Sequence, residues 1–123
     1  MKRYMQIAAI TVLALVFGAI GLAKLTNPAM FQDQFARFGL PNWFVFVTGA
    51  DELLAAALLA SFNDVRRRFG AAMLAVTMAV ATSLHVINDP LAMALPAFTL
   101  MLLAGYVARV PLGKGAKRGL RGA

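Results

Sequence analysis

Two neighbouring carboxylic acids, Asp51 and Glu52, lie in the middle of an apolar run that is long enough to cross a membrane. As a helix, residues 43–62 would cover roughly 30 Å at about 1.5 Å per residue, which is the hydrocarbon thickness of a bilayer. A charge in the middle of that layer costs several kcal/mol unless it is paired, hydrated or protonated. The two acids are therefore candidates for exchanging a proton or a hydrogen bond with a bound molecule.

The residues around Glu52 indicate which way each acid faces. Thr48, Gly49 and Ala56 share the helical face of Glu52. Small residues of this kind let a neighbouring helix approach closely and leave room for polar partners. We therefore expect Glu52 to face the interior of a helix bundle and Asp51 to lie between this face and the large apolar one, although the pattern alone does not decide between the two acids.

Lys24 ends the first apolar run and has two interpretations. The first is a lysine at the membrane surface that extends its amine to the lipid head groups, which is the commoner case. The second is a counter-ion for Asp51 or Glu52. The depths of Lys24 and Glu52 differ by about 12 Å at 1.5 Å per residue, which two long side chains would only just bridge. The sequence therefore favours the first interpretation.

His85 lies near the outer end of the third apolar run, on one helical face with Thr82. A single histidine there is usually a hydrogen-bonded structural residue, and the alternative is that it shares a site with the acids. If a small apolar molecule binds, we expect it in the outer half of the bundle, between the first three spans. Otherwise side chains fill this space, and Glu52 makes a structural hydrogen bond to His85 or Lys24. The candidate ligand-binding residues are Lys24, Thr48, Asp51, Glu52, Thr82 and His85.

The residue types that are missing exclude several kinds of chemistry. The chain has no cysteine and one histidine, so it offers no thiolate nucleophile, no cysteine-ligated metal and no site with several histidines. It also lacks a glycine loop of the kind that holds the phosphates of a flavin or a nucleotide. We therefore predict no metal and no cofactor within the chain, apart from a quinone as a bound ligand, and the sequence does not identify a catalytic residue. Any redox reaction would need a partner that carries the cofactor.

Four apolar runs must position these residues, and 61% of the chain is hydrophobic. Only helices suit runs of this length in lipid, because short open strands would leave backbone groups unpaired. We predict an all-α membrane protein with a single transmembrane domain over residues 1–123, folded as an up-down-up-down bundle of four helices. Pro96 should kink or loosen the outer end of the fourth span. The predicted spans are residues 4–25, 43–62, 69–87 and 91–108.

A short amphipathic helix is predicted between the first and second spans. Asn27 should cap it, Pro28 should take its first position and Gly39 should end it. Its phenylalanines would either roof the bundle or anchor in lipid at the outer membrane surface, and anchoring is the commoner case. They recur at helical spacing on one side: Phe31, Phe35 and Phe38.

The formal net charge of +7 comes from basic residues at the ends of the apolar runs. They form no patch on a soluble domain, which argues against nucleic acid as a partner. Lys24 and Arg37 lie on one side of the predicted bundle, and the positive-inside rule makes the other side cytoplasmic, with both termini and a flexible basic tail at residues 113–123. The expected location is a bacterial-type inner membrane. The cytoplasmic basic residues are Lys2, Arg3, Arg66, Arg67, Arg68, Arg109, Lys114, Lys117, Arg118 and Arg121.

Four short segments of the chain are characteristic when taken together: Gly21-Leu22-Ala23-Lys24-Leu25, Phe38-Gly39-Leu40-Pro41, Gly49-Ala50-Asp51-Glu52-Leu53-Leu54, and the residues from Thr82 to His85. They resemble the DoxX-like family of integral membrane proteins. The resemblance implies a four-helix bundle, with Lys24, Glu52 and His85 at family-like positions and Asp51 at a less typical one. Members of this family are linked to thiosulfate:quinone oxidoreductase subunits or have no assigned activity.

Two functions are compatible with these observations. The first is a small membrane subunit that binds a quinone or a similar apolar molecule, as part of a membrane redox complex. The second is a non-catalytic accessory or assembly subunit whose buried acids pair with a partner protein and fix its register. A transporter is the least favoured class, because four spans lack a second acidic helix. Beyond the lipid bilayer, the expected partners are further copies of this chain or a larger membrane complex.

Overall fold

The computed structural model describes residues 2–111, and this part of the chain is helical and contains no strand, as predicted. The predicted basic tail at residues 113–123 lies outside the described residues. The elements in chain order are α1 (Lys2–Thr26), α2 (Ala29–Arg37), α3 (Phe44–Leu59), α4 (Asp64–Asn88), the 3-10 helix η1 (Leu91–Ala94) and α5 (Leu95–Arg109).

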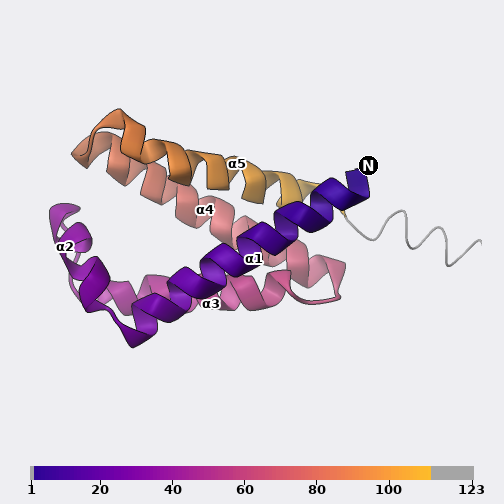
Figure 1. Ribbon diagram of the computed structural model, residues 1–123, viewed down its shortest axis with the longest axis horizontal. Coiled ribbons are helices and arrows are strands. Elements are labelled where there is room, and N and C mark those ends of the chain that lie inside the picture. Colours follow the sequence, from indigo (N-terminus) through magenta and orange to yellow (C-terminus); the bar gives the residue numbers. More distant parts are fainter. Residues whose placement is uncertain (1, 112–123) are drawn as a thin grey trace, which may run out of the picture.

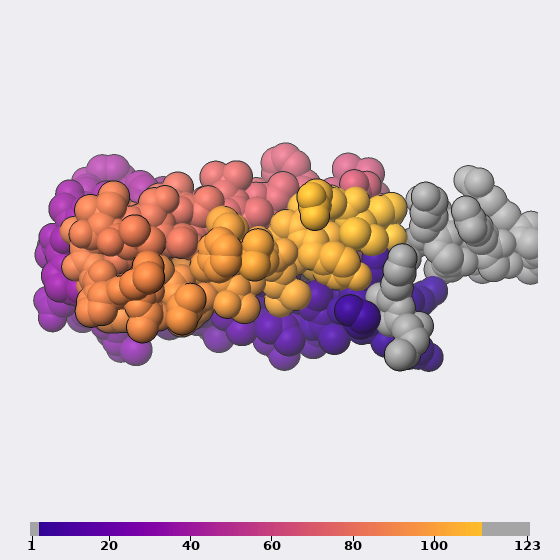
Figure 2. Space-filling model, turned by 90° about the horizontal axis from the view of Figure 1, so that it is seen from above, coloured from indigo at the N-terminus to yellow at the C-terminus, as the bar shows by residue number. Residues whose placement is uncertain are grey.

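The long helices α1, α3, α4 and α5 run alternately toward and away from the end of the molecule where α2 lies (Figure 1). Helix α1 packs against α3, α4 packs against α5, and α3 packs against α4. The two pairs diverge toward the α2 end, and α2 lies across that end. Figure 2 shows α5 along the face viewed from above, with α4 along one edge and α1 along the other.

Helices α1 and α3 are in direct backbone contact. A Cβ atom added to Gly21 would lie 2.8 Å from the backbone oxygen of Gly49 and 2.8 Å from the backbone nitrogen of Leu53. Gly18 is less crowded, because its added Cβ would lie 3.7 Å from the Cβ of Ala56. Gly18 and Gly21 therefore lie on the surface of α1 on which α3 rests.

The core of the bundle is apolar and so is much of its outer surface. The largest fully buried apolar side chains are Leu13, Phe17, Val45, Leu59 and Leu74. Large exposed apolar side chains are spread over the outside of every long helix, for example Leu15, Leu22, Leu54, Val76 and Leu102. Such a surface suits lipid rather than water. Three segments are long and apolar enough to cross a membrane: Arg3–Thr26, Asp64–Asn88 and Leu91–Arg109.

Helix α3 is shorter than predicted. The expected span covered residues 43–62, whereas the helix is 16 residues long and ends at Leu59. At about 1.5 Å per residue it measures roughly 24 Å, which is less than the hydrocarbon thickness of a typical bilayer. The prediction failed because Ala60, Ser61 and Phe62 are apolar or small but lie in the turn that leads to α4.

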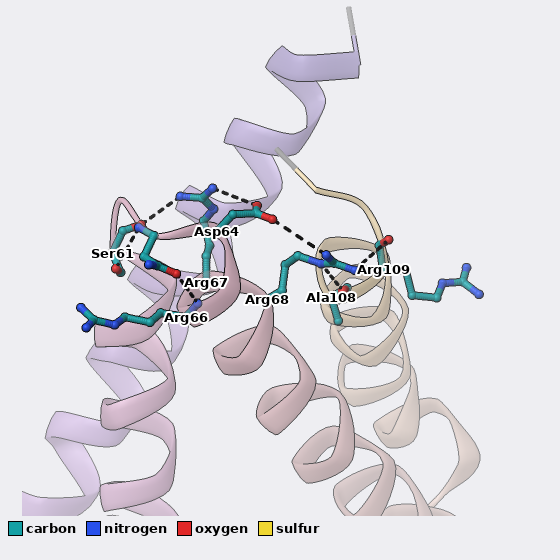
Figure 3. Close-up of polar contacts among 8 residues, drawn as sticks. Ser61, Asp64, Arg66, Arg67, Arg68, Ala108 and Arg109 are labelled. Atoms are coloured by element: carbon teal, nitrogen blue, oxygen red, sulfur yellow. Dashed lines mark hydrogen bonds and ion pairs between the residues drawn. The ribbon is translucent and has the colours of Figure 1, made fainter. Parts of the chain in front are cut away.

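Helix α4 begins earlier than predicted, at Asp64 instead of residue 69. The side chain of Asn63 caps it, because its Oδ1 atom accepts a hydrogen bond from the backbone N–H of Arg66 at 3.0 Å. Residues 64–68, which fall between the second and third predicted spans, are therefore the start of a helix. Figure 3 shows the side chain of Arg66 directed away from the neighbouring arginines.

The end of the molecule opposite α2 is held together by two arginines from the first turn of α4 (Figure 3). Arg67 donates a hydrogen bond to the backbone oxygen of Ser61 at 2.9 Å and lies 3.1 Å from a carboxylate oxygen of Asp64. Arg68 donates to the backbone oxygen of Ala108 at 2.8 Å. These contacts tie the ends of α3 and α5 to α4, so the arginine run has a structural role within the chain.

Pro96 and Asn27, near the α2 end, act differently from what the sequence suggested. Pro96 lies in the first turn of α5, directly after the 3-10 helix η1. It therefore removes no hydrogen bond from a helix interior, and the predicted kink within the fourth span is absent. Asn27 does not cap α2, which starts after Pro28 without a side-chain cap. Gly39 ends α2 as predicted, with a φ of 77°. The backbone N–H of Leu40 then returns to the oxygen of Phe35 at 2.9 Å, which closes a Schellman motif.

Candidate functional site

Lys24 and Glu52 form a buried ion pair between α1 and α3, with 2.6 Å between Nζ and Oε1. Lys24 is 8% exposed and Glu52 is 2% exposed. The interpretation of Lys24 as a residue that reaches for lipid head groups is therefore wrong, and Glu52 faces the interior as expected. A Cβ on Gly49 would lie 2.8 Å from the Cβ of Lys24. Lys24 is thus level with Gly49, less than one helical turn from Glu52, so the difference in depth is much smaller than the assumed value of about 12 Å.

The phenylalanines of α2 cover this ion pair. The Nζ atom of Lys24 lies 5.5 Å from the ring centroid of Phe31 and 5.3 Å from that of Phe35. Both distances are within the range of a cation–π contact. Phe35 is buried, and the ring of Phe38 meets His85 edge-on at 5.2 Å between centroids. These phenylalanines therefore cover the end of the bundle, which was the less common of the two predicted arrangements.

Asp51 faces α4, whereas its neighbour Glu52 faces Lys24 of α1. The hydroxyl oxygen of Thr77 lies 2.7 Å from Oδ2 of Asp51 and 2.9 Å from the backbone oxygen of Met73. Thr77 was not predicted as a site residue. It lies two helical turns before His85 on the same face of α4, and this spacing is the signal that would have identified it.

His85, Asp89 and Arg37 connect α4 to the end of α2. His85 Nδ1 lies 2.7 Å from Oδ2 of Asp89, and the other oxygen of Asp89 is ion-paired with Arg37. Burial raises the pKa of the Asp89 carboxyl, but hydrogen bonds from Arg37 and His85 outweigh this effect and hold the pKa below its usual value. Asp89 was not predicted as a site residue.

A cavity of about 320 Å³ lies beneath α2, between α3 and α4. Its lining is mostly apolar, and the polar groups that reach it are the Lys24–Glu52 pair, the Asp51–Thr77 pair and His85. Among the predicted site residues, Thr82 does not line it, and its hydroxyl donates to the backbone oxygen of Met78 at 2.6 Å. The lining residues are Lys24, Gln34, Phe35, Phe38, Leu40, Phe44, Val47, Thr48, Asp51, Glu52, Val76, Thr77, Met78, Val80, Ala81, Leu84 and His85.

This arrangement can hold a small molecule by its polar end without a metal ion. Among residues 2–111, no three histidine, aspartate or glutamate side chains come together as a set of metal ligands. The two neighbouring acids have different surroundings: Glu52 is neutralised by Lys24, whereas Asp51 is held by a hydroxyl. One site therefore presents an ammonium group, an acid and an imidazole within an otherwise apolar wall.

Comparison with models of protein families shows to which family the chain belongs. The sequence model of the DoxX-like family matches residues 8–106, a range that includes every residue lining the cavity. Comparisons with curated proteins and with solved structures find no match. Because the family match spans most of the 123 residues, and the apolar helices suit a bilayer, this membrane protein belongs to the DoxX-like family.

Proposed function

We propose that this protein binds a small apolar molecule with a polar head group, such as a quinone, in the cavity beneath α2. The observation that supports the proposal is the cavity itself, whose size is at the lower end of the range of ligand pockets. Such pockets combine an apolar lining with a few convergent polar groups. The ammonium group of Lys24 has three N–H donors, and Glu52 takes one of them.

The same contacts argue against Glu52 as the acid that would pair with a partner protein in the accessory-subunit alternative. That alternative needs buried acids that remain open for a partner protein. Glu52 is already paired within the chain and is covered by α2, so a partner helix would have to displace Lys24. We therefore place the protein as a ligand-binding subunit of a membrane redox complex or a homo-oligomer, in which electrons would be supplied by a partner.

Ligand binding is testable through the single tryptophan of the chain, Trp43. Its ring lies 5.8 Å between centroids from that of Phe44, which lines the cavity. A quinone with a short alkyl chain should quench Trp43 fluorescence saturably in detergent micelles. Filling the cavity with Ala81→Phe should weaken this binding by about tenfold or more, because the added ring takes the space of the ligand.

The matched control is Ala72→Phe, which adds the same ring to an exposed position of α4 outside the cavity. It should leave the titration unchanged. Equal quenching curves for the unmodified protein and both variants would mean that the quinone only partitions into the micelle, and the proposal would then fail.

We also propose that all four long helices cross the membrane, with both termini in the cytoplasm of a bacterial-type inner membrane and α2 on the outer side. Helix α3 is short, but Trp43 before it suits the interface, and local thinning of the bilayer accommodates a short span. Reporter enzymes fused after Gly39 and after Asn63 should report opposite sides. The same side for both fusions would show that α3 does not cross.

A further inference from the structure

The cavity is open at its side, between α3 and α4. Val47, Val76 and Val80 line it, yet they are 47%, 66% and 54% exposed. A residue that both lines a cavity and lies at the surface marks an opening. All three are apolar and project from helices whose outer surfaces suit lipid, so this opening faces acyl chains rather than water.

The end of the cavity beneath α2 is closed by contrast. Phe35 is buried there, and Phe38 packs against His85. The ion pair between Arg37 and Asp89 fastens α2 to the end of α4, and the side chain of Asp89 is only 2% exposed. A molecule coming from the aqueous phase would have to break this ion pair and lift the helix.

Asp51 keeps the capacity to accept a further hydrogen bond. Lys24 is already paired with Glu52, and within residues 2–111 no cation lies within ion-pairing distance of Asp51. The hydroxyl of Thr77 has a single proton and two acceptors in range, Asp51 and the backbone oxygen of Met73, so it can serve only one of them at a time. The cavity is therefore lined by an acid whose hydrogen bonding is incomplete.

From these observations we infer that the ligand enters sideways from the lipid between α3 and α4, and that its head group donates a hydrogen bond to Asp51. The inference rests on the proposed function and names the ligand class: a membrane-dissolved amphiphile with a hydroxyl-bearing head, such as a phenol or a quinol, and a hydrocarbon tail. The head reaches Asp51, and the tail leaves past the three valines into the bilayer. A carboxylate that accepts an O–H bond in an apolar cavity favours a donor head strongly over a non-donor.

The head-group part is tested with a matched pair of probes, a long-chain alkylphenol and its methyl ether, by calorimetric titration in detergent micelles. The phenol should bind about tenfold tighter than the ether. Asp51→Leu, which keeps the size and removes the acceptor, should abolish this preference. Asp33→Leu removes an exposed acid of α2 and should preserve it. Equal affinity of the two probes for the unmodified protein, or an unchanged preference in Asp51→Leu, would overturn the assignment.

The route is tested by locking each opening in turn, which is simple because the chain has no cysteine of its own. A bifunctional thiol reagent would join Val47→Cys to Val80→Cys across the side opening, or Arg37→Cys to Asp89→Cys across the α2 end. Entry from lipid predicts that the first link slows the association of a short-chain quinol, followed by Trp43 fluorescence, about tenfold or more relative to the unlinked Val47→Cys/Val80→Cys protein. The second link should leave the rate equal to that of the unlinked Arg37→Cys/Asp89→Cys protein, so that only the effect of the link is compared. A cleavable reagent should restore the rate on reduction, which separates blocking from misfolding.

The outcomes separate the inference from the proposal on which it rests. If no probe binds the unmodified protein, both fail together. If probes bind but the link across the α2 end slows their entry while the side link does not, the ligand comes from the aqueous side, and only the lateral route is wrong.

Discussion

Replacement of Glu52 by glutamine is expected to destabilise the folded bundle by about 3 to 5 kcal/mol, the usual cost of leaving one member of a buried ion pair alone. The glutamine keeps the shape but removes the negative charge that lies 2.6 Å from Lys24. Lys24 is then a buried cation under two phenylalanine rings, with no carboxylate to neutralise it. The loss is measurable as a shift in the unfolding midpoint during denaturation with a strong detergent, followed by circular dichroism.

Two further variants make this result specific. Asp51→Asn should cost only about 1 kcal/mol, because Asp51 loses charge but keeps an oxygen that can accept from Thr77. The double variant Lys24→Met with Glu52→Leu should recover most of the stability, because it removes both buried charges and keeps similar volumes. A larger loss for Asp51→Asn than for Glu52→Gln would contradict the assignment of Glu52 as the inward-facing, paired acid.

The second large effect is expected from the smallest substitution, Gly21→Ala. The added methyl group would lie 2.8 Å from backbone atoms of both Gly49 and Leu53, and backbone cannot swing aside as a flexible side chain can. Helices α1 and α3 would have to separate, which also stretches the Lys24–Glu52 pair. We expect a loss of about 3 kcal/mol in the same unfolding measurement, at the upper end of the usual cost of overpacking.

Two other glycines provide the controls for this prediction. Gly105→Ala adds the same methyl group in α5 where no atom lies within 4 Å. It should be neutral or stabilise the helix by about 0.5 to 1 kcal/mol, because alanine is a better helix former than glycine. Gly18→Ala would make an ordinary 3.7 Å contact with Ala56 and should be tolerated. If Gly21→Ala were as mild as Gly105→Ala, the close packing of α1 on α3 would be wrong.

The helical fold was predictable from the sequence because long apolar runs and their basic flanks follow directly from the physics of the bilayer. The ends of the helices were harder to predict. The Asn63 cap extends α4 back to Asp64, while Ala60 and Phe62, which are apolar, belong to a turn. Hydropathy measures the affinity of each residue for lipid. A capping side chain or a turn does not change this affinity, so hydropathy alone does not locate the ends of a helix.

The site was predictable as far as helical faces could locate it. Glu52, Thr48 and His85 line the cavity because residues on one face of a helix stay together whatever the tertiary contacts. Lys24 was misjudged because its depth was counted along each helix separately, whereas the vertical register of two helices is set by their contact, here at Gly21 and Gly49. Asp89 depends on similar long-range geometry, because its ion pair with Arg37 joins two elements that are far apart in the chain.

The contact between α1 and α3 also has a consequence for how the chain is made. Synthesis proceeds from the N-terminus, so α1, with Lys24 near its end, is present in the membrane before α3 emerges from the ribosome. Helix α3 has 16 residues and two acids, which makes it a weak insertion signal by itself. When it arrives, the glycine surface of α1 and the amine of Lys24 are already in place, so in the proposed topology the segment that carries the two acids enters lipid alongside the partner that neutralises Glu52.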